Sequence, residues 1–415
     1  MDFTLDSPIT RATFHIFPPA SLPGTSAKIA LSNHPVAPLN HIDKLLNPAS
    51  VVRTAQRQTK LSRQPEPDVL DALERLVRSY LKEASLHLPG AVLVRAQLLY
   101  LMRARLQLDE LWDANPAWHA EPVVKPIFII GLPRSGSTFL HETLTQASGL
   151  RAPLAWEAMY PCPLNGSWFS QWWRINQTRL RFALINTIAP NFKDIHPLAA
   201  TAPQECVCIT ALAFASQQFT HAAYLPEYAD WLEREGGAIA MKYHQRFLQV
   251  LQSTSADTRW LLKAPSHSYN IEQLLATYSD ATIVQTHRDP TQVIASISSL
   301  SVTLCRIFSS NVDAQKIGRD ACEGWARAIG RINRFRSSNM EMASRFIDVK
   351  YPELADDPER VVNELLGKLS IGAQKVSSEM IHEIRSQHRQ VHRHKYSLAD
   401  FGLTEQNVRS LFPTS

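Results

Sequence analysis

One stretch constrains the fold more than any other: residues 127–144, which read IFIIGLPRSGSTFLHETL. Four apolar residues, rich in β-branching, run into a turn of Gly, Pro and Ser, and apolar residues then recur with helical spacing. This pattern predicts a buried strand, a phosphate-binding loop and a helix. Such a loop turns successive backbone N–H groups toward an anion at the positive end of the helix. The chain is therefore expected to bind a nucleotide.

Strand and helix patterns alternate further along the chain. Short strands are predicted at 260–265, 281–286 and 345–349, with helices over 269–278 and from 291 onward. Strands that alternate with helices form parallel sheets, since each crossover returns the chain to the same end of the sheet. The predicted fold class is α/β, a P-loop-like doubly wound parallel sheet with flanking helices and an N-terminal helical region. Ligand loops should gather at the carboxyl ends of the strands.

The chain divides into three parts. Residues 1–65, rich in Pro, Ser, Ala and Thr, are expected to form a loosely ordered N-terminal arm with short helices. Residues 66–120 carry two helical patterns with Pro89-Gly90 between them, which predicts a helical hairpin. Residues 121–415 form the α/β domain. Within it, a helical insertion at about 150–255 shows helical patterns over 174–188, 205–219 and 239–252.

Composition excludes several classes of protein. The formal net charge of +5 suits an anionic ligand, but it is too small and dispersed for a nucleic-acid partner. The five cysteines show neither a CxxC pair nor a zinc-ligand spacing, which favours free thiols in a reducing compartment. The N-terminus lacks the pattern of a signal peptide, and no apolar run approaches the ~18–20 residues of a membrane span. A cytoplasmic location is expected.

The phosphate loop departs from that of a nucleoside triphosphatase at one position. Ser137 stands where the Walker lysine belongs, and the positive charge lies inside the loop as Arg134. We also find no strand that ends in a metal-binding acid, so a metal-bound triphosphate is not expected. The loop can still bind one phosphate through its backbone and hydroxyl groups. The predicted ligand residues are Pro133, Arg134, Ser135, Gly136, Ser137 and Thr138.

A second anion site is predicted where the 281–286 strand ends. Arg288 leaves that strand, and Ser296 lies eight residues on, two turns into the next helix. A guanidinium and a hydroxyl brought together there can bind a phosphate monoester. The alternative interpretation is a surface arginine followed by an ordinary helix start, with Asp289 as the cap and Pro290 in the first turn. Two anion sites on consecutive sheet units favour a nucleotide phosphorylated at both its 5′ and 3′ positions.

In these two motifs the chain resembles the sulfotransferases that use 3′-phosphoadenosine 5′-phosphosulfate (PAPS), above all the broad, mostly bacterial sulfotransferase group. Further matching segments are Trp156-Glu157, His196, 203–206 (PQEC), 262–267 (LKAPSH), 351–358 and 394–402. The resemblance implies PAPS as co-substrate, adenosine 3′,5′-bisphosphate as product and no metal. The acceptor would be a hydroxyl or amine of a small molecule, lipid or glycan, bound by the insertion at 150–255. The alternatives are a nucleotide-dependent kinase on a degenerate P-loop and a non-catalytic nucleotide-binding protein.

Sulfuryl transfer without a metal needs cationic side chains and a base for the acceptor proton. Arg134 is the first cation, and Lys263 matches the family lysine that stabilises the leaving phosphate. Three residues compete as the base. Glu157 is our first choice, although it can instead be a buried acid that fixes the loop. His267 is the second choice, and His196 is the third.

Two further ligand positions follow from the resemblance. Tyr351 matches the position that contacts adenine, with a core tyrosine as the alternative, and Lys395 lies where relatives bring a C-terminal segment back to the 3′-phosphate. An aromatic cluster at 168–173 (WFSQWW) is expected to fill the core and wall the acceptor pocket. Contact with a membrane surface that holds a lipid acceptor is the alternative for this cluster. The oligomeric state is left open.

Overall fold

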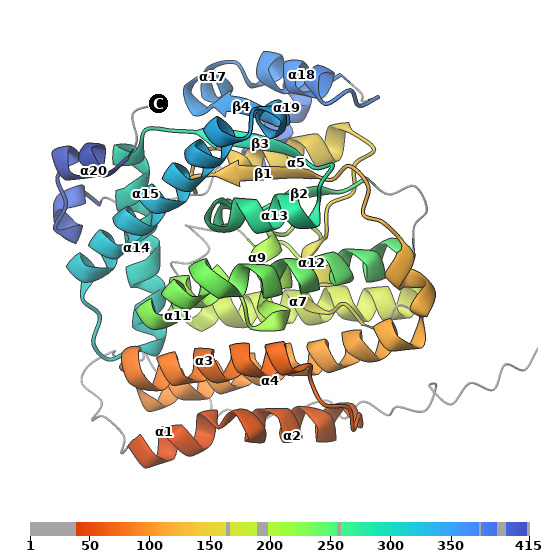
Figure 1. Ribbon diagram of the computed structural model, residues 1–415, viewed down its shortest axis with the longest axis vertical. Helices are drawn as coiled ribbons and strands as arrows, with labels where there is room; N and C mark the ends of the chain where they lie inside the picture. The colour runs from red at the N-terminus through yellow and green to blue at the C-terminus, as the bar shows by residue number, and fades with distance from the viewer. Residues whose placement is uncertain are drawn as a thin grey trace, which may run out of the picture. The chain divides into compact units, whose positions relative to one another are not determined.

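The computed structural model describes residues 39–162, 167–188, 198–254, 259–372, 375–387 and 396–412. Its centre is a sheet of four parallel strands in the order β2-β1-β3-β4 (Figure 1). The strands are β1 (Ile127–Gly131), β2 (Leu261–Lys263), β3 (Thr282–His287) and β4 (Phe346–Lys350). Each lies within a few residues of a strand that the sequence predicts. The α/β fold class with a parallel sheet is confirmed.

The strand order sets where a ligand can bind. β1 lies in the interior of the sheet, where Ile129 pairs with Lys263 of β2 on one side and with Val284 of β3 on the other. The chain passes from β1 to β2 in one direction and then crosses back to form β3 and β4. In sheets of this order the crevice at the β1/β3 reversal, outside the carboxyl ends of the strands, is the ligand site.

Side chains of β1 alternate between two hydrophobic layers. Ile127 and Ile129 pack in a cluster with residues of α5 (Ser137–Ala147) and α18 (Pro358–Lys368). Phe128 and Ile130 pack in a larger cluster with residues of α12 (Gly237–Gln252) and α13 (Ile271–Thr277). Helices therefore cover both faces of the sheet, as a doubly wound fold requires, and this explains why β1 is apolar at every position.

Among the described residues, four α-helices precede the sheet: α1 (Leu39–Leu46), α2 (Pro48–Thr59), α3 (Pro67–Glu83) and α4 (Leu88–Ala114). α1 and α2 lie within the predicted N-terminal arm and pack against α4. α3 and α4 are the two predicted helices of the hairpin. The predicted break at Pro89-Gly90 is wrong: α3 ends at Glu83, and both residues lie in the first turn of α4. Proline is tolerated there because an N–H in the first turn has no partner within the helix.

The insertion holds α6 (Ala155–Met159), α7 (Trp168–Ile188), α9 (Cys206–Thr210), α10 (Gln217–Ala222), α11 (Pro226–Trp231) and α12, with the short turns η3 (Ala211–Ala213) and η4 (Leu232–Gly236), whereas the turn η2 (Pro116–Ala120) precedes β1. The single helix predicted over 205–219 is broken. Phe214 adopts a left-handed conformation, with φ of 54°, and the Tyr228 hydroxyl donates to its carbonyl at 2.8 Å. Ser216 then caps α10 by accepting from the Gln218 N–H at 3.2 Å.

The aromatic cluster on α7 corrects a second expectation. Trp173 is half-buried and packs edge-on against Tyr160, as a core residue would. Trp168, Phe169 and Trp172 are instead 75%, 58% and 53% exposed. The prediction of core packing is therefore wrong for three of the four aromatic residues. Sequence density alone cannot show which side of a helix faces the solvent.

The C-terminal half supplies η5 (Pro265–Asn270), α14 (Pro290–Phe308), α15 (Ala314–Ser338), α16 (Met340–Ala343), α17 (Tyr351–Asp356), α19 (Ser378–Gln387), η6 (Leu398–Phe401) and α20 (Glu405–Leu411).

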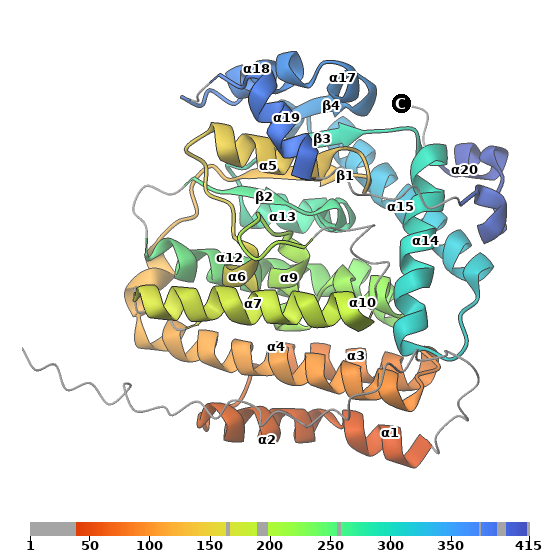
Figure 2. The same cartoon turned by 180° about the vertical axis from the view of Figure 1, so that it is seen from behind.

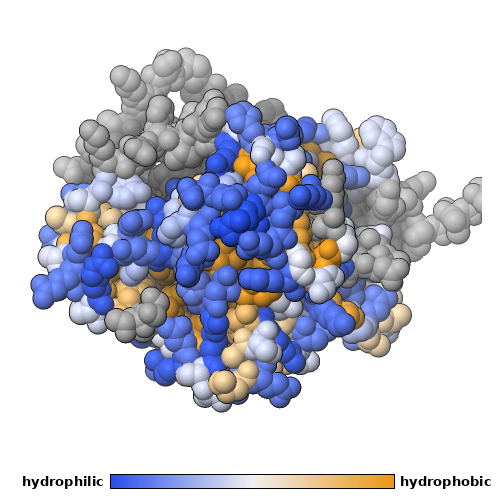
Figure 3. Space-filling view, turned by 90° about the horizontal axis from the view of Figure 1, so that it is seen from above, coloured by the Kyte–Doolittle hydropathy of each residue, from blue (hydrophilic) through white to orange (hydrophobic). Residues whose placement is uncertain are grey.

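By length and composition α14 could cross a membrane, contrary to the expectation that no segment approaches that length. Half of its most apolar window is buried, and it packs against α10, α15 and α20, so it fits a core helix. The face over α17 and α18 is mainly hydrophilic (Figure 3).

Charged side chains connect the layers. Within α4, Arg105 donates to Asp109 at 2.5 Å, and the two side chains are 2% and 0% exposed. Arg246 of α12 reaches the same carboxylate at 3.3 Å. At the far edge of the sheet, Asp348 of β4 accepts two hydrogen bonds, at 2.7 and 2.8 Å, from Arg336 of α15. These pairs hold α12 against α4 and α15 against the sheet.

Candidate active site

The phosphate loop begins where β1 and β3 almost touch. Gly131 has φ of 122°, and a Cβ at this position would lie 2.3 Å from the backbone oxygen of Thr286. Only glycine fits such a conformation and such a close approach. The Gly131 N–H donates to the Ser268 hydroxyl of η5 at 3.2 Å. The ends of β1 and β3 and the turn after β2 therefore meet at one point.

The loop is held from beneath. The Ser135 hydroxyl is fully buried, donates to the Leu132 carbonyl and lies 2.6 Å from the Thr286 hydroxyl. This side chain holds the loop against β3. Of the Ser135 groups predicted to bind an anion, the hydroxyl is therefore engaged and the backbone N–H is left for that role. Pro133 is half-buried, whereas Arg134 is exposed. Arg134 is held in the left-handed region, with φ of 63°.

α5 begins directly after the loop with an N-terminus suited to an anion. Its N-cap is Gly136, which makes no side-chain cap, and its first turn carries no acidic residue. Unsatisfied N–H groups at such a terminus attract phosphate or sulfate. In that turn Ser137 is buried and Thr138 is exposed. The predicted strand, loop and helix are all present.

Lys263 lies beside this helix start, at the end of β2. Its side chain is only 3% exposed, and its ammonium donates to the Thr138 hydroxyl at 3.2 Å. The same ammonium forms an ion pair with Glu205, whose side chain is 22% exposed. A buried cation needs such a partner, since leaving it alone in the interior would be costly. Lysine, loop hydroxyl and carboxylate thus form one cluster at the crevice.

Arg288 approaches the loop from β3. One of its terminal N–H groups donates to the Arg134 carbonyl at 2.6 Å, and its guanidinium lies 4.0 Å from the ring centre of Tyr351. Tyr351 is also close to the loop, because a Cβ on Gly136 would lie 3.2 Å from its ring. The structure therefore brings together the loop, the predicted 3′-phosphate arginine and the predicted adenine contact.

The helix that follows Arg288 starts as the alternative interpretation has it. Asp289 is the N-cap of α14 and accepts from the Thr291 N–H at 2.9 Å, with Pro290 in the first turn. This start is compatible with an anion site, since it leaves the Arg288 side chain directed at the loop. Ser296 is buried two turns into α14, at 7% exposure.

The two described base candidates of the sequence have other contacts. Glu157 is buried, accepts from Arg151 at 2.9 Å and from the Leu154 N–H at 2.9 Å, and so engages both oxygens at the start of α6. This is the structural role that the sequence left open for it. His267 is 3% exposed, and burial lowers its pKa to about 4. His196 lies outside the described residues, as does Lys395.

His267 belongs to a buried group with Cys206 and His244, each of which offers one ligand atom within 4.8 Å of the others. The Nδ1 atom of His244 is hydrogen-bonded to the Tyr278 hydroxyl at 2.7 Å, while the Nε2 atoms of both histidines have no hydrogen-bond partner. Three ligands are one fewer than a structural zinc site uses. We interpret the group as neutral core packing beneath the site.

Glu205 is the residue that sequence reasoning missed. It stands in the segment 203–206, but that local pattern gives no sign of a partner 58 positions away. Its position is set by backbone pairing: the Gln204 N–H donates to the Pro153 carbonyl at 2.8 Å, and the Trp156 N–H to the Ala200 carbonyl at 3.0 Å. These bonds hold the approach to α9 alongside the start of α6.

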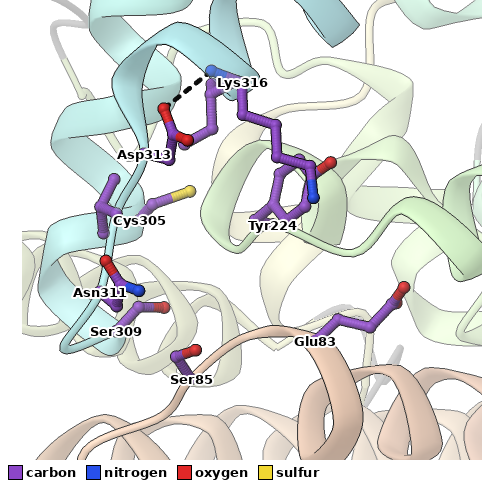
Figure 4. Close-up of a pocket in the computed structure, with 10 residues that line it drawn as sticks. Glu83, Ser85, Tyr224, Cys305, Ser309, Asn311, Asp313 and Lys316 are labelled. Atoms are coloured by element: carbon purple, nitrogen blue, oxygen red, sulfur yellow. Dashed lines mark hydrogen bonds between the residues drawn. The ribbon is translucent and has the colours of Figure 1, made fainter.

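Two cavities lie apart from this cluster. One, of about 270 Å³, is lined by residues that include Tyr224, Cys305 and Lys316 (Figure 4). The other, of about 290 Å³, shares Tyr224 and Cys305 and extends along α14 to Ile297, the residue after Ser296. Neither lining includes the loop, Lys263 or Glu205.

A parallel sheet with a glycine-containing loop at its reversal point, and with cations from the strands on either side of β1, is the arrangement of the P-loop-like class of nucleotide-binding folds. The profile of the sulfotransferase family matches residues 126–375, which include every part of the cluster described above. The match covers more than half of the chain. The protein belongs to the sulfotransferase family.

Individual relatives agree with this assignment. The omega-hydroxy-beta-dihydromenaquinone-9 sulfotransferase of Mycobacterium bovis is 26% identical over 265 residues, which are 61% of this chain and 65% of the relative. The crystal structure of sulfotransferase STF1 from Mycobacterium tuberculosis aligns with a TM-score of 0.75 and 29% identity, covering 88% of this chain and 97% of that one. Sulfotransferase STF9 from Mycobacterium avium aligns with a TM-score of 0.72 and 25% identity, covering 88% and 94%.

Proposed function

We propose that this protein transfers a sulfuryl group from PAPS to a hydroxyl of a lipid or other apolar small molecule. The observation that carries the proposal is the cluster of Lys263, Thr138 and Glu205 beside the loop that joins β1 to α5. A relative that sulfates a menaquinone derivative supports a lipid hydroxyl as the acceptor. Five cysteines without a disulfide support a cytoplasmic location.

The loop and the start of α5 would bind the 5′-phosphosulfate. Backbone N–H groups of residues 134–138 supply donors, and Arg134 and Lys263 supply the charge that a metal supplies in triphosphatases. In the reaction the bond from sulfur to the bridging oxygen breaks, and a bond from sulfur to the acceptor oxygen forms. Lys263 would stabilise negative charge on the bridging oxygen, and adenosine 3′,5′-bisphosphate leaves.

Glu205 is the proposed base in place of Glu157. Its carboxylate already lies against the Lys263 ammonium, whereas both oxygens of Glu157 are engaged in fixing α6. When Lys263 turns toward the bridging oxygen, Glu205 is released to accept the proton of the acceptor hydroxyl. His267, with its low pKa and buried ring, is a weaker candidate.

The 3′-phosphate would bind at Arg288, with Ser296 as a second donor. The contacts of Arg288 with the loop carbonyl and with the ring of Tyr351, the proposed adenine contact, support this assignment. A guanidinium is suited to this task, since it binds phosphate oxygens in a fixed fork.

Titration calorimetry with adenosine 3′,5′-bisphosphate, AMP and ATP tests the donor assignment. We expect tight binding of the bisphosphate in the presence of EDTA, and a much larger loss for the bisphosphate than for AMP in Arg288→Ala. Equal losses for both nucleotides would refute the 3′-phosphate site. Binding of ATP that requires Mg²⁺, with none of the bisphosphate, would favour the kinase alternative and refute sulfuryl transfer.

Paired variants test the catalytic roles. Turnover with labelled PAPS and a panel of apolar alcohols should fall by at least about 100-fold in Glu205→Gln and in Lys263→Ala, the range for loss of a general base or of an electrostatic contact. Glu157→Gln is the matched control and should retain turnover per folded molecule. The reverse pattern would return the base to Glu157.

A further inference from the structure

We propose that the solvent face of α7 is a membrane-docking surface, which binds the headgroup region of an anionic phospholipid bilayer and brings the lipid acceptor to the site. This inference rests on the proposed function, since it names the source of the acceptor. It begins from an exposed surface that the sulfuryl-transfer chemistry does not use.

The surface is large and apolar. Five of the eleven large hydrophobic side chains that are exposed in the described part of the chain lie on this one helix. They are Trp168, Phe169, Trp172, Leu180 and Leu184, at 75%, 58%, 53%, 66% and 57% exposure. Exposed apolar patches of this kind mark interaction sites, whereas single exposed residues do not.

Their spacing places them along one side of the helix. Trp168 and Trp172 are four residues apart, and so are Leu180 and Leu184, with Asn176 continuing the row of four between the pairs. The rings of Phe169 and Trp172 stack at 5.9 Å, so the aromatic residues form one outward group. Figure 2 shows α7 lying across the near side of the molecule.

Charge favours a lipid surface as the occupant. No aspartate or glutamate occurs between 168 and 188. Arg179 is exposed on the same side, whereas Arg174 is buried and the Arg181 guanidinium lies over the Tyr100 ring at 3.8 Å. Tryptophan at the edge of an apolar helical face, with arginine beside it and no acid, is the composition of helices that lie in the membrane interface.

The position of α7 connects this surface to the chemistry. α7 packs against α6, and α6 packs against α9. The segment that leads into Glu205 is paired with the start of α6 through the bonds from Gln204 to Pro153 and from Trp156 to Ala200. A bilayer held at α7 would thus lie two helices, α7 and α6, from the segment that carries the proposed base. A lipid acceptor would therefore approach Glu205 from this side.

Co-sedimentation with vesicles tests the proposal. The full chain is incubated with vesicles of phosphatidylcholine, with and without phosphatidylglycerol. We expect the wild type to bind the mixed vesicles and the Trp168→Ser/Trp172→Ser variant to bind at least about tenfold more weakly. Arg179→Gln should lose about fivefold on the anionic vesicles alone. Met340→Ser is the matched control, since Met340 is 80% exposed on another helix, and it should bind like the wild type.

Two further measurements separate the possible failures. Calorimetry with adenosine 3′,5′-bisphosphate should give the same affinity for all these variants, because none of them touches the loop. Retained bisphosphate binding without vesicle binding would refute docking and leave sulfuryl transfer standing. In sedimentation velocity without lipid, a wild-type dimer that becomes monomeric in the Trp168/Trp172 variant would overturn the proposal in favour of self-association.

Discussion

Replacing Gly131 by alanine is the most direct test of how the site is built. The new Cβ would lie 2.3 Å from the Thr286 backbone oxygen and 2.8 Å from its hydroxyl oxygen. Ordinary contacts of a Cβ begin near 3.4 Å, so β1 and β3 must separate by about 1 Å at the point where they end. The backbone of the new alanine would also have to keep φ of 122°.

The steric clash and the strained backbone both destabilise the variant. Overfilling a packed site costs about 1–3 kcal/mol, and a sparsely populated backbone conformation costs about 1–3 kcal/mol more. Gly131→Ala should therefore lower the free energy of unfolding by about 4 kcal/mol. Because the same shift displaces the loop, binding of adenosine 3′,5′-bisphosphate should weaken as well.

Urea unfolding followed by tryptophan fluorescence measures the first effect, and calorimetry measures the second. Gly149→Ala is the matched control, since Gly149 has nothing within 4 Å of a new Cβ, and it should stay within about 0.5 kcal/mol of wild type. A loss below about 1 kcal/mol in Gly131→Ala, with bisphosphate affinity retained, would refute the close approach of β1 and β3.

Three other perturbations follow from the contacts described. Asp109→Ala leaves the buried Arg105 guanidinium without its partner and should cost about 3–5 kcal/mol, whereas Asp113→Ala, in an exposed pair, should cost less than about 1 kcal/mol; urea unfolding compares them. Hydrogen bonds from Arg336 and His287 hold the pKa of Asp348 far below its ordinary value. The stabilisation by this carboxylate is therefore present above about pH 4 and is lost on acidification. Thermal melting from pH 7 to pH 2 should accordingly fall less steeply in Asp348→Asn, and equal slopes would contradict this. Tyr351→Ala removes the ring beneath the proposed 3′-phosphate arginine and should weaken bisphosphate binding about tenfold in calorimetry, with thermal melting as the check on folding.

Local pattern was sufficient to predict the sheet and the loop. Helices cover both faces of the sheet, so β1 is buried and apolar at every position. A continuous apolar run of this kind is typical of a central parallel strand, and it predicts one from the sequence. The spacing of the glycines predicted the loop, because the backbone conformation of a loop depends on a few adjacent residues. The same reasoning located α14 through Asp289 and Pro290, whose capping is local.

What could not be predicted depends on contacts between distant segments. Glu205 and Lys263 are 58 positions apart, and nothing near either residue selects the other. Glu157 has the residue type of a base and lies in a segment that resembles the family, yet Arg151 and the Leu154 N–H bind its two oxygens. The outward side of α7 was likewise undetermined, because aromatic residues on adjacent turns pack inward or outward according to the neighbouring layer.

The burial of Lys263 gives Glu205 a structural role beside its proposed catalytic role, and one variant separates the two. An ammonium this buried needs a counter-charge, so Glu205→Gln should destabilise the free protein as well as slow turnover. Adenosine 3′,5′-bisphosphate brings negative charge to the same loop and would replace the missing carboxylate. Its binding should therefore raise the melting temperature of Glu205→Gln by more than that of wild type, since a ligand adds more stability the more tightly it binds the folded protein. If bisphosphate instead stabilised the variant less than wild type, Glu205 would be a contact of the nucleotide site and not the counter-charge of Lys263 and the proposed base.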